Sequence, residues 1–291
     1  MTGSAAADWA EWLTRTRFAG MTHAEREEAL ASLGRIRDRV LEAAELRDGD
    51  DVLDLGAGTG LLTFGALDRI GAGRVIAVDP SAAALEELLL AAHEADAAGI
   101  TCLVGDASVI PLQDDAVDAC VTRSVLMYVD DLRAAAAEIG RVLKPGGRLS
   151  SFEPVNRKGT SIATVVDWTP LGADLATRVA AEWEDHAATT SLLRFDEREL
   201  ARGLDAAGFV DVRVDLEMTT EEWTVDRRSA DARLDAVGAA GELSLRERWR
   251  RAFEPHELEA LVAHLHNLSG QTLTFARPQA WITARRADGR S

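Results

Sequence analysis

The sequence predicts a doubly wound α/β fold built on a mostly parallel sheet. Three observations support this fold class: short apolar runs alternate with helical stretches from Asp51 onward, a glycine-rich turn follows the first run, and acidic residues stand at the ends of the next two. Alternating strands and helices form a parallel sheet through right-handed crossovers. Ligands of such sheets bind in the crevice at the carboxyl ends of the strands. The pattern therefore also predicts which edge of the sheet carries a site.

The predicted core strands are short runs of apolar residues. They are Val52–Leu55, Val75–Val78, Thr101–Val104, Ala119–Thr122 and Arg148–Phe152. Helices are expected between them, for example over Ala82–Ala98 and Asp131–Leu143, because both stretches are rich in Ala and Leu. The second helix is followed by Lys144-Pro145-Gly146-Gly147, a sequence that terminates helices.

Segments on both sides of this core are expected to be mainly helical. Residues 1–45 are interpreted as an N-terminal helical lid, followed by the core at 46–153, a helical cap insertion at 154–194 and a return to the core at 195–223. A second cap insertion at 224–270 precedes the final strand and C-terminus at 271–291. All seven tryptophans lie outside Asp51–Ser151. They form either aromatic mini-cores or the lining of a pocket for an apolar substrate.

The composition excludes several other classes of protein. With 47% hydrophobic and 28% charged residues, the chain resembles an average globular protein, and no apolar run reaches the length of a membrane span. The start of the sequence lacks the pattern of a secretory signal, so a cytoplasmic location is expected. A net charge of −17 would repel a phosphate backbone, which argues against a nucleic-acid partner. Cys102 and Cys120 have no ligand-like spacing, so no metal is expected.

The turn after the first strand has the sequence Gly56-Ala57-Gly58-Thr59-Gly60 and leads into a helix that begins near Leu61. Glycines let a ligand approach the backbone closely, and amides at a helix N-terminus are expected to be free to donate hydrogen bonds. The dinucleotide-binding fingerprint requires another glycine at the position of Leu61. A nicotinamide or flavin cofactor is therefore disfavoured.

Acidic residues follow the next two predicted strands. Asp79 ends the second strand and precedes Pro80, and a carboxylate there can accept both hydroxyl protons of a ribose. Asp106 follows the third strand within Gly105-Asp106-Ala107, where it can accept a proton from an exocyclic adenine amine. The three strand ends together predict a site for an adenosine-containing ligand.

This ordered set of motifs resembles the class I S-adenosylmethionine-dependent methyltransferases, and in particular the branch similar to ubiquinone/menaquinone-biosynthesis methyltransferases. The similarity begins at Val52 and extends through Asp79, Asp106 and Val117-Asp118 to Arg141-Val142-Leu143-Lys144-Pro145-Gly146-Gly147-Arg148-Leu149. It implies S-adenosylmethionine as the cofactor. It also implies a seven-stranded Rossmann-like sheet whose last two strands, Val210–Leu216 and Gln279–Ala284, form an antiparallel hairpin.

The resemblance further implies roles for individual residues. The methionine part of the cofactor would lie against Asp54 and the turn formed by Gly56, Ala57, Gly58, Thr59 and Gly60. Asp79 with Pro80 would hold the ribose, and Asp106 with Ala107 would face the adenine. The backbone of Arg123 would meet the methionine ammonium, and Arg17 would clamp the cofactor carboxylate. The alternatives are helix caps or solvated strand ends for the acids and an exposed salt bridge for Arg17.

The residues after the fourth strand bear on the acceptor. The segment Arg123–Tyr128 lacks the Asn/Asp-Pro-Pro-aromatic turn of methyltransferases that modify amino groups of nucleic acid or glutamine, so such acceptors are disfavoured. Methyl transfer from an activated sulfonium depends mainly on positioning and desolvation. Glu153 and Tyr128 are the catalytic candidates for proton handling. The alternatives are a hydrogen-bonded structural carboxylate and a packed ring.

The sequence thus predicts an enzyme that methylates a small molecule at O, C or N and releases S-adenosylhomocysteine. Two alternatives remain: a regulatory or non-catalytic protein that binds the cofactor on the same fold, and an enzyme that uses S-adenosylmethionine for another group transfer. The acceptor and the oligomeric state have no signature in the sequence.

Overall fold

The computed structural model describes residues 11–13 and 15–288, except for the side chain of Arg17. One seven-stranded sheet has the order β3-β2-β1-β4-β5-β7-β6. The strands are β1 (Asp51–Leu55), β2 (Arg74–Asp79), β3 (Ile100–Val104), β4 (Val117–Arg123), β5 (Leu143–Pro154), β6 (Phe209–Thr224) and β7 (Thr272–Arg286). β1 to β5 pair in parallel, and β7 is antiparallel to β5 and β6. The predicted fold class is confirmed.

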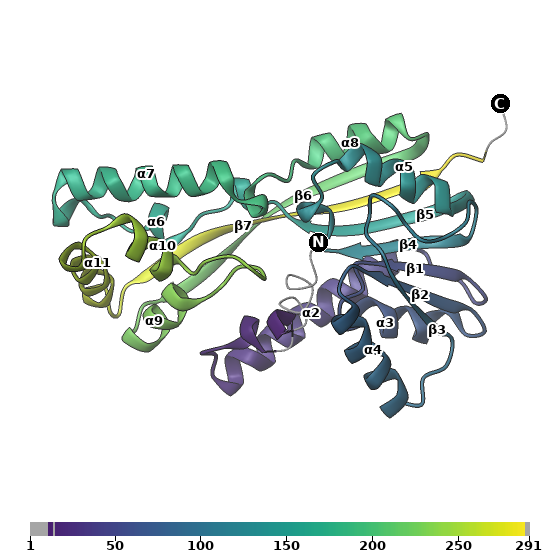
Figure 1. The fold of residues 1–291 in the computed structure, drawn as a ribbon, viewed down its shortest axis with the longest axis horizontal. Helices are drawn as coiled ribbons and strands as arrows, with labels where there is room; N and C mark the ends of the chain where they lie inside the picture. The colour runs from purple at the N-terminus through teal and green to yellow at the C-terminus, as the bar shows by residue number, and fades with distance from the viewer. Residues whose placement is uncertain (1–10, 14, 289–291) are drawn as a thin grey trace.

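Helices cover both faces of this sheet (Figure 1). α2 (His23–Ala43), α3 (Leu61–Ile70) and α4 (Ala82–Glu94) lie on one face, and α5 (Leu132–Val142) and α8 (Glu197–Ala206) lie on the other. Successive strand residues point to opposite faces, so Val52 packs with α2 and α3 while Leu53 belongs to the cluster that includes α5 and α8. The strands are consequently buried on both sides, which explains their continuous apolar sequences.

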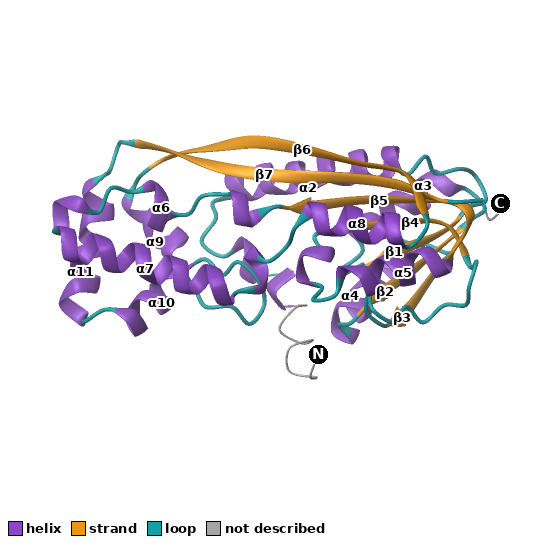
Figure 2. Cartoon of the chain, turned by 90° about the horizontal axis from the view of Figure 1, so that it is seen from above, coloured by secondary structure: helices purple, strands orange, loops and turns teal. Residues whose placement is uncertain are grey.

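The last two strands are longer than the predicted Val210–Leu216 and Gln279–Ala284, and those bounds are corrected accordingly. β7 pairs with β5 only as far as Pro154↔Gln279, whereas its pairing with β6 continues to Thr224↔Thr272. Beyond the sheet the two strands form a ribbon that runs to a separate group of helices (Figure 2). Its outer part contains exposed polar residues such as Thr219 and Glu222. The sequence of this part therefore lacks the apolar run that predicts a buried strand.

The separate group of helices, here called the cap, comes from two chain segments. α6 (Ile162–Val165) and α7 (Ala173–Thr189) lie between β5 and β6, and α9 (Arg227–Asp235), α10 (Leu245–Ala252) and α11 (Pro255–Asn267) lie between β6 and β7. Short 3₁₀ helices complete the structure: η1 (Thr16–Phe18), η2 (Leu126–Tyr128), η3 (Asn156–Lys158), η4 (Thr169–Leu171) and η5 (Ser191–Leu193). No helix in the part of the chain that the structure describes has the length and apolarity needed to cross a membrane.

The cap has its own aromatic core. Trp168 and Trp249 meet edge to face with ring centroids 5.4 Å apart, and Trp223 and Phe275 from the ribbon pack in the same cluster. These three tryptophans are buried, so for them the mini-core interpretation is the one that the structure favours. Trp9 lies outside the described residues.

Candidate active site

A cavity of about 750 Å³ lies where the carboxyl ends of β1, β2 and β4 meet the cap. Its core side consists of predicted cofactor residues from three strand ends and from β4: Asp54, Gly56, Ala57, Gly58, Thr59, Asp79, Pro80, Asp106, Ala107 and Arg123. Its other side comes from η5, from the loop between α9 and α10, and from Trp12 and Leu13. Gly60 is not part of the lining, because it serves as the N-cap residue of α3. The side chain of Arg17 lies outside the described residues.

The glycine turn is held tightly against its neighbours. Gly56 has φ 73°, and a Cβ at this position would lie 2.1 Å from Cγ2 of Val125. The amides of Gly56 and Ala57 donate to the carbonyl of Val78, and the amide of Gly58 donates to Oδ2 of Asp79 at 2.8 Å. These three amides precede α3, so the prediction about amides at the helix N-terminus stays a prediction. The hydrogen bonds of the turn fix it to β2, so a ligand would meet a preorganised backbone.

Two carboxylates lie at the centre of the core side. Asp79 accepts hydrogen bonds from the amides of Gly58 and Ser81, each at 2.8 Å, and burial raises the pKa of Asp79. Asp54 is buried and accepts from the hydroxyl of Thr63 at 2.6 Å. Burial raises the pKa of Asp54 to about 7, and the nearby charge of Asp79 acts in the same direction. A cationic ligand would stabilise both groups as carboxylates, and each carboxylate oxygen has a second lone pair for a hydroxyl donor.

Asp106 stands at the open end of the site. Its Oδ1 accepts from the amide of Ser108 at 2.8 Å, and the residue is exposed. This local turn orients the carboxylate and leaves Oδ2 without a hydrogen bond among the described residues. Asp106 is thus available to a polar group of a ligand at that end.

The loop after β4 is anchored by Glu153. The buried carboxylate accepts hydrogen bonds from the amides of Val125, Leu126 and Met127 at 3.2 to 3.3 Å, and from the hydroxyl of Ser151 at 3.1 Å. Burial raises the pKa of Glu153 to about 7, and these hydrogen bonds act in the opposite direction. Glu153 does not line the cavity. The geometry favours the structural alternative over the catalytic one for this residue.

Comparison with known proteins agrees with this site. A family model described as a methyltransferase domain matches residues 53–151. A malonyl-[acyl-carrier protein] O-methyltransferase of Methylococcus capsulatus is 34% identical over 156 residues, which is 52% of this chain and 56% of that protein. This part of the chain, which includes Asp54, the glycine turn, Asp79 and Asp106, is therefore similar to methyltransferases. Nocamycin O-methyltransferase of Saccharothrix syringae is 28% identical over 285 residues, covering 92% of this chain and 96% of that protein.

Other matches cover only part of the relative's length or show a likeness of fold alone. The chain spans about half the length of several curated relatives that it matches, such as 56% of the Methylococcus protein. The crystal structure of the YcgJ protein from Bacillus subtilis superposes with a TM-score of 0.55 at 19% identity, over 89% of this chain and 99% of that one. This last likeness is one of fold.

Tyr128 lines the larger cavity, unlike Glu153. Burial raises the pKa of Tyr128 above its ordinary value, and the charge of Glu153 adds to this effect. The phenol therefore stays protonated at neutral pH and suits hydrogen-bond donation better than proton abstraction.

Several residues that line the larger cavity are not predicted by any pattern in the sequence. They come from the cap and from the N-terminal segment: Trp12, Leu13, Ser191, Leu192, Gly238, Ala239, Ala240 and Glu242. The indole Nε1 of Trp12 donates to the carbonyl of Val237 at 2.9 Å, which ties the N-terminal segment to the α9–α10 loop. These contacts join segments far apart in the chain, so no local pattern announces them.

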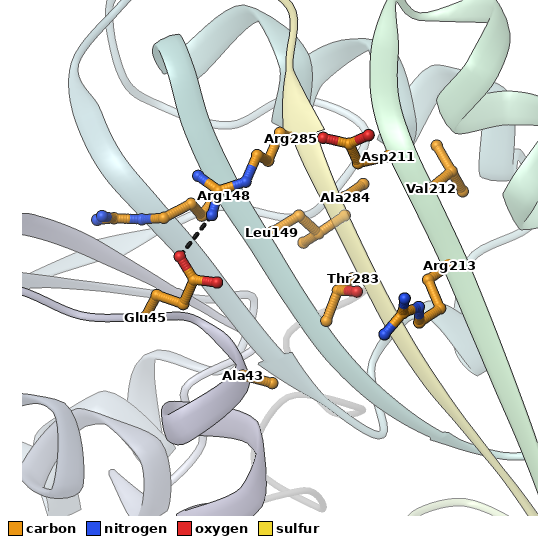
Figure 3. A pocket seen from close by; sticks show the side chains of 10 residues that line it. All are labelled: Ala43, Glu45, Arg148, Leu149, Asp211, Val212, Arg213, Thr283, Ala284 and Arg285. Atoms are coloured by element: carbon orange, nitrogen blue, oxygen red, sulfur yellow. Dashed lines mark hydrogen bonds and ion pairs between the residues drawn. The ribbon is translucent and has the colours of Figure 1, made fainter.

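A second, smaller cavity of about 370 Å³ is lined by residues at the end of α2 and on β5, β6 and β7 (Figure 3). Arg148, Arg213 and Arg285 line it together with the acids Glu45 and Asp211. Arg285 pairs with Glu45, and Arg148 pairs with Asp50. Because ligands of doubly wound sheets bind at the carboxyl ends of the strands, the larger cavity is the candidate active site.

Proposed function

We propose that this protein transfers the methyl group of S-adenosylmethionine to a small-molecule acceptor within the larger cavity. The observation that carries the proposal is the convergence of the glycine turn, Asp79 and Asp106 on one cavity that the cap covers from the other side. The bound cofactor supplies a methyl group on a positively charged sulfur. This sulfur is the leaving group, and it needs no further activation. The net charge of −17 supports a small molecule rather than a nucleic acid as acceptor.

The core residues divide the cofactor among them in this proposal. Asp79 accepts the ribose hydroxyls, and Asp106 with Ala107 contacts the adenine. Asp54 and the glycine turn lie against the methionine part, where the buried carboxylate attracts the positive charges of the ligand. The backbone of Arg123 faces the methionine ammonium, and the assignment of Arg17 to the carboxylate stays a prediction.

Oxygen is the acceptor atom that we propose. The relative that aligns over 96% of its length is named as an O-methyltransferase, and so is the Methylococcus relative. Placement of the acceptor in line with the methyl group then provides most of the acceleration. Tyr128 donates a hydrogen bond to the acceptor, and Glu153 acts as a positioning residue that holds the loop carrying Tyr128.

A pair of glycine variants tests the cofactor site. Gly56→Ala places a methyl group 2.1 Å from Val125, whereas Gly208→Ala creates the same kind of left-handed strain, at φ 83°, with no neighbour within 4 Å. Calorimetry should show that the wild type binds S-adenosylmethionine and S-adenosylhomocysteine, that Gly56→Ala weakens binding by about a hundredfold or more, and that Gly208→Ala leaves it within about threefold. Thermal melting of all three proteins checks that they are folded. Failure of the wild type to bind either ligand overturns the proposed function.

A further inference from the structure

Arg123 presents a partly buried cation to the cavity. It is the last residue of β4 and lines the cavity beside Tyr128. Its Nε atom is buried and has no hydrogen-bond partner, and its guanidinium forms no ion pair with any described residue. Burial lowers the pKa of Arg123, yet an arginine side chain remains protonated at neutral pH. A positive charge is therefore held in the site without an ion-pair partner among the described residues, although the charge of Glu153 acts on it.

Other well-buried arginines of the described chain have carboxylate partners. Arg148, Arg246 and Arg248 are each paired with a carboxylate, as in the 2.9 Å contact between Arg248 and Glu182. A buried charge without a partner is costly, so such pairing is the rule in protein interiors. The exception at Arg123 indicates that a ligand in the cavity supplies the missing negative charge.

No described acid of the cavity wall forms an ion pair with Arg123. The acids of the wall accept hydrogen bonds from other groups: Asp54 from Thr63, Asp79 from Gly58 and Ser81, Asp106 from Ser108, Asp131 from Arg133 and Ala134, and Glu242 from Thr190, while Asp130 pairs with Arg194. The charge of Glu153 acts on Arg123, but its carboxylate accepts from three backbone amides and a hydroxyl. A direct ion-pair partner for the guanidinium can therefore come from a ligand.

The position of Arg123 points to the acceptor rather than the cofactor. Arg123 and Tyr128 line the same cavity, and the charge of Glu153, which holds the loop carrying Tyr128, acts on the guanidinium. The lining near Tyr128 is largely apolar and includes Met127, Val129 and Leu192. This half of the cavity suits an organic molecule with one anionic group.

We propose that Arg123 binds an acidic oxygen of the acceptor, so that the substrates are small oxygen acids such as carboxylic acids, enols or acidic phenols. This inference rests on the proposed function and names the substrate class of the same site. The guanidinium favours the deprotonated acceptor; an enol or phenol releases its proton to solvent on binding, whereas a carboxylic acid is already ionised at neutral pH. An oxygen lone pair then forms the new O–C bond while the C–S bond breaks and its electron pair stays on sulfur. The methylated product is neutral and loses its attraction to Arg123, which promotes release.

Matched pairs of small molecules test this substrate class without knowledge of the natural acceptor. A set of aliphatic and aromatic carboxylic acids, each with its primary amide, is titrated calorimetrically into the wild-type protein saturated with S-adenosylhomocysteine. The variants are Arg123→Met, Arg123→Lys and the control Arg213→Met, which removes an exposed arginine far from this cavity. Binding of S-adenosylmethionine is measured for all four proteins.

We expect acids to bind the wild type about tenfold or more tightly than their amides, Arg123→Met to abolish this preference, and Arg123→Lys to retain part of it. Arg213→Met should match the wild type, and affinity for S-adenosylmethionine should stay within about threefold in every variant. Equal binding of acids and amides, or a preference that survives Arg123→Met, overturns the inference. So does a loss of S-adenosylmethionine affinity in Arg123→Met, which would assign the arginine to the cofactor. A wild type that binds no cofactor would instead refute the proposed function.

Discussion

The hydrophobic core around the sheet and the core of the cap differ in the types of side chain that they contain. The core around the sheet consists mostly of aliphatic side chains, many of them on strands that pair on both sides, such as Leu53, Val78 and Leu149. The cap core is dominated by rings, among them Trp168 and Trp249, on short helices attached to a two-stranded ribbon. A small unit with little backbone pairing gains more from each large aromatic side chain than from an aliphatic one. The sheet provides the proposed cofactor half of the site, and the loop between α9 and α10 contributes to the other half.

The largest expected effect concerns the independence of the two cores. Trp249 is fully buried in the cap, so Trp249→Ala should lower the free energy of unfolding of the cap by about 3–5 kcal/mol. Because the cofactor half belongs to the sheet core, affinity for S-adenosylmethionine should stay within about threefold. Denaturant unfolding followed by fluorescence, together with calorimetry, measures both. Trp183→Ala, at a partly buried position in the same cap, serves as the milder control. A cofactor affinity that collapses with Trp249→Ala would show that the cores are not separable.

The next effect concerns the pH dependence of stability that a buried acid of the sheet core causes. The pKa of Asp54 is about 7 in the folded protein, and its ordinary value is near 4, so the folded state retains a proton that the unfolded chain releases between these values. Stability from this group is therefore full below about pH 4 and is lost as the pH rises to about 7, by about 4 kcal/mol at most. Asp54→Asn should remove this component.

Unfolding measured at pH 5 and pH 8 checks the prediction for Asp54. The stability of Asp54→Asn relative to the wild type should increase at the higher pH. Glu153 titrates in the same range, because burial raises its pKa to about 7 as well, so the variant should keep the part of the pH dependence that belongs to Glu153. An identical pH dependence in both proteins would contradict the assignment to Asp54.

The smallest effect is confined to the cofactor contact. Asp79→Ala removes the proposed ribose acceptor and the partner of the Gly58 amide, and it should weaken S-adenosylmethionine binding by about 1–3 kcal/mol. Asp215→Ala, at an exposed position on β6, is the matched control and should bind normally. Calorimetry at neutral pH decides the matter. Unchanged affinity in Asp79→Ala would remove the ribose assignment.

The same contrast explains what the sequence could predict. The sheet strands and the glycine turn are local patterns, so apolar runs such as Val52–Leu55 and the glycines at 56 and 58 reveal them directly. The outer halves of β6 and β7 are not visible in this way, because their polar residues face solvent and their pairing partners lie 48 or more residues away, as in Thr224↔Thr272.

The same limit applies to individual site residues, because contacts between distant parts of the chain leave no local pattern. Glu153 stands at a strand end that suits a catalytic base, but the amides of Val125, Leu126 and Met127, which are 26 to 28 residues away in the chain, take up its carboxylate. Arg123 is predicted through its backbone alone. The absence of an ion-pair partner for its side chain emerges only when all the neighbouring acids are in place.

Amide hydrogen exchange with and without S-adenosylhomocysteine tests the division of labour between core and cap most directly. If the sheet core alone holds the cofactor, the ligand should slow exchange in residues 55–60 and 79–81, while α7 and α11 of the cap exchange as in the free protein. Protection that is concentrated in those cap helices, or none in the segments after β1 and β2, would contradict the account.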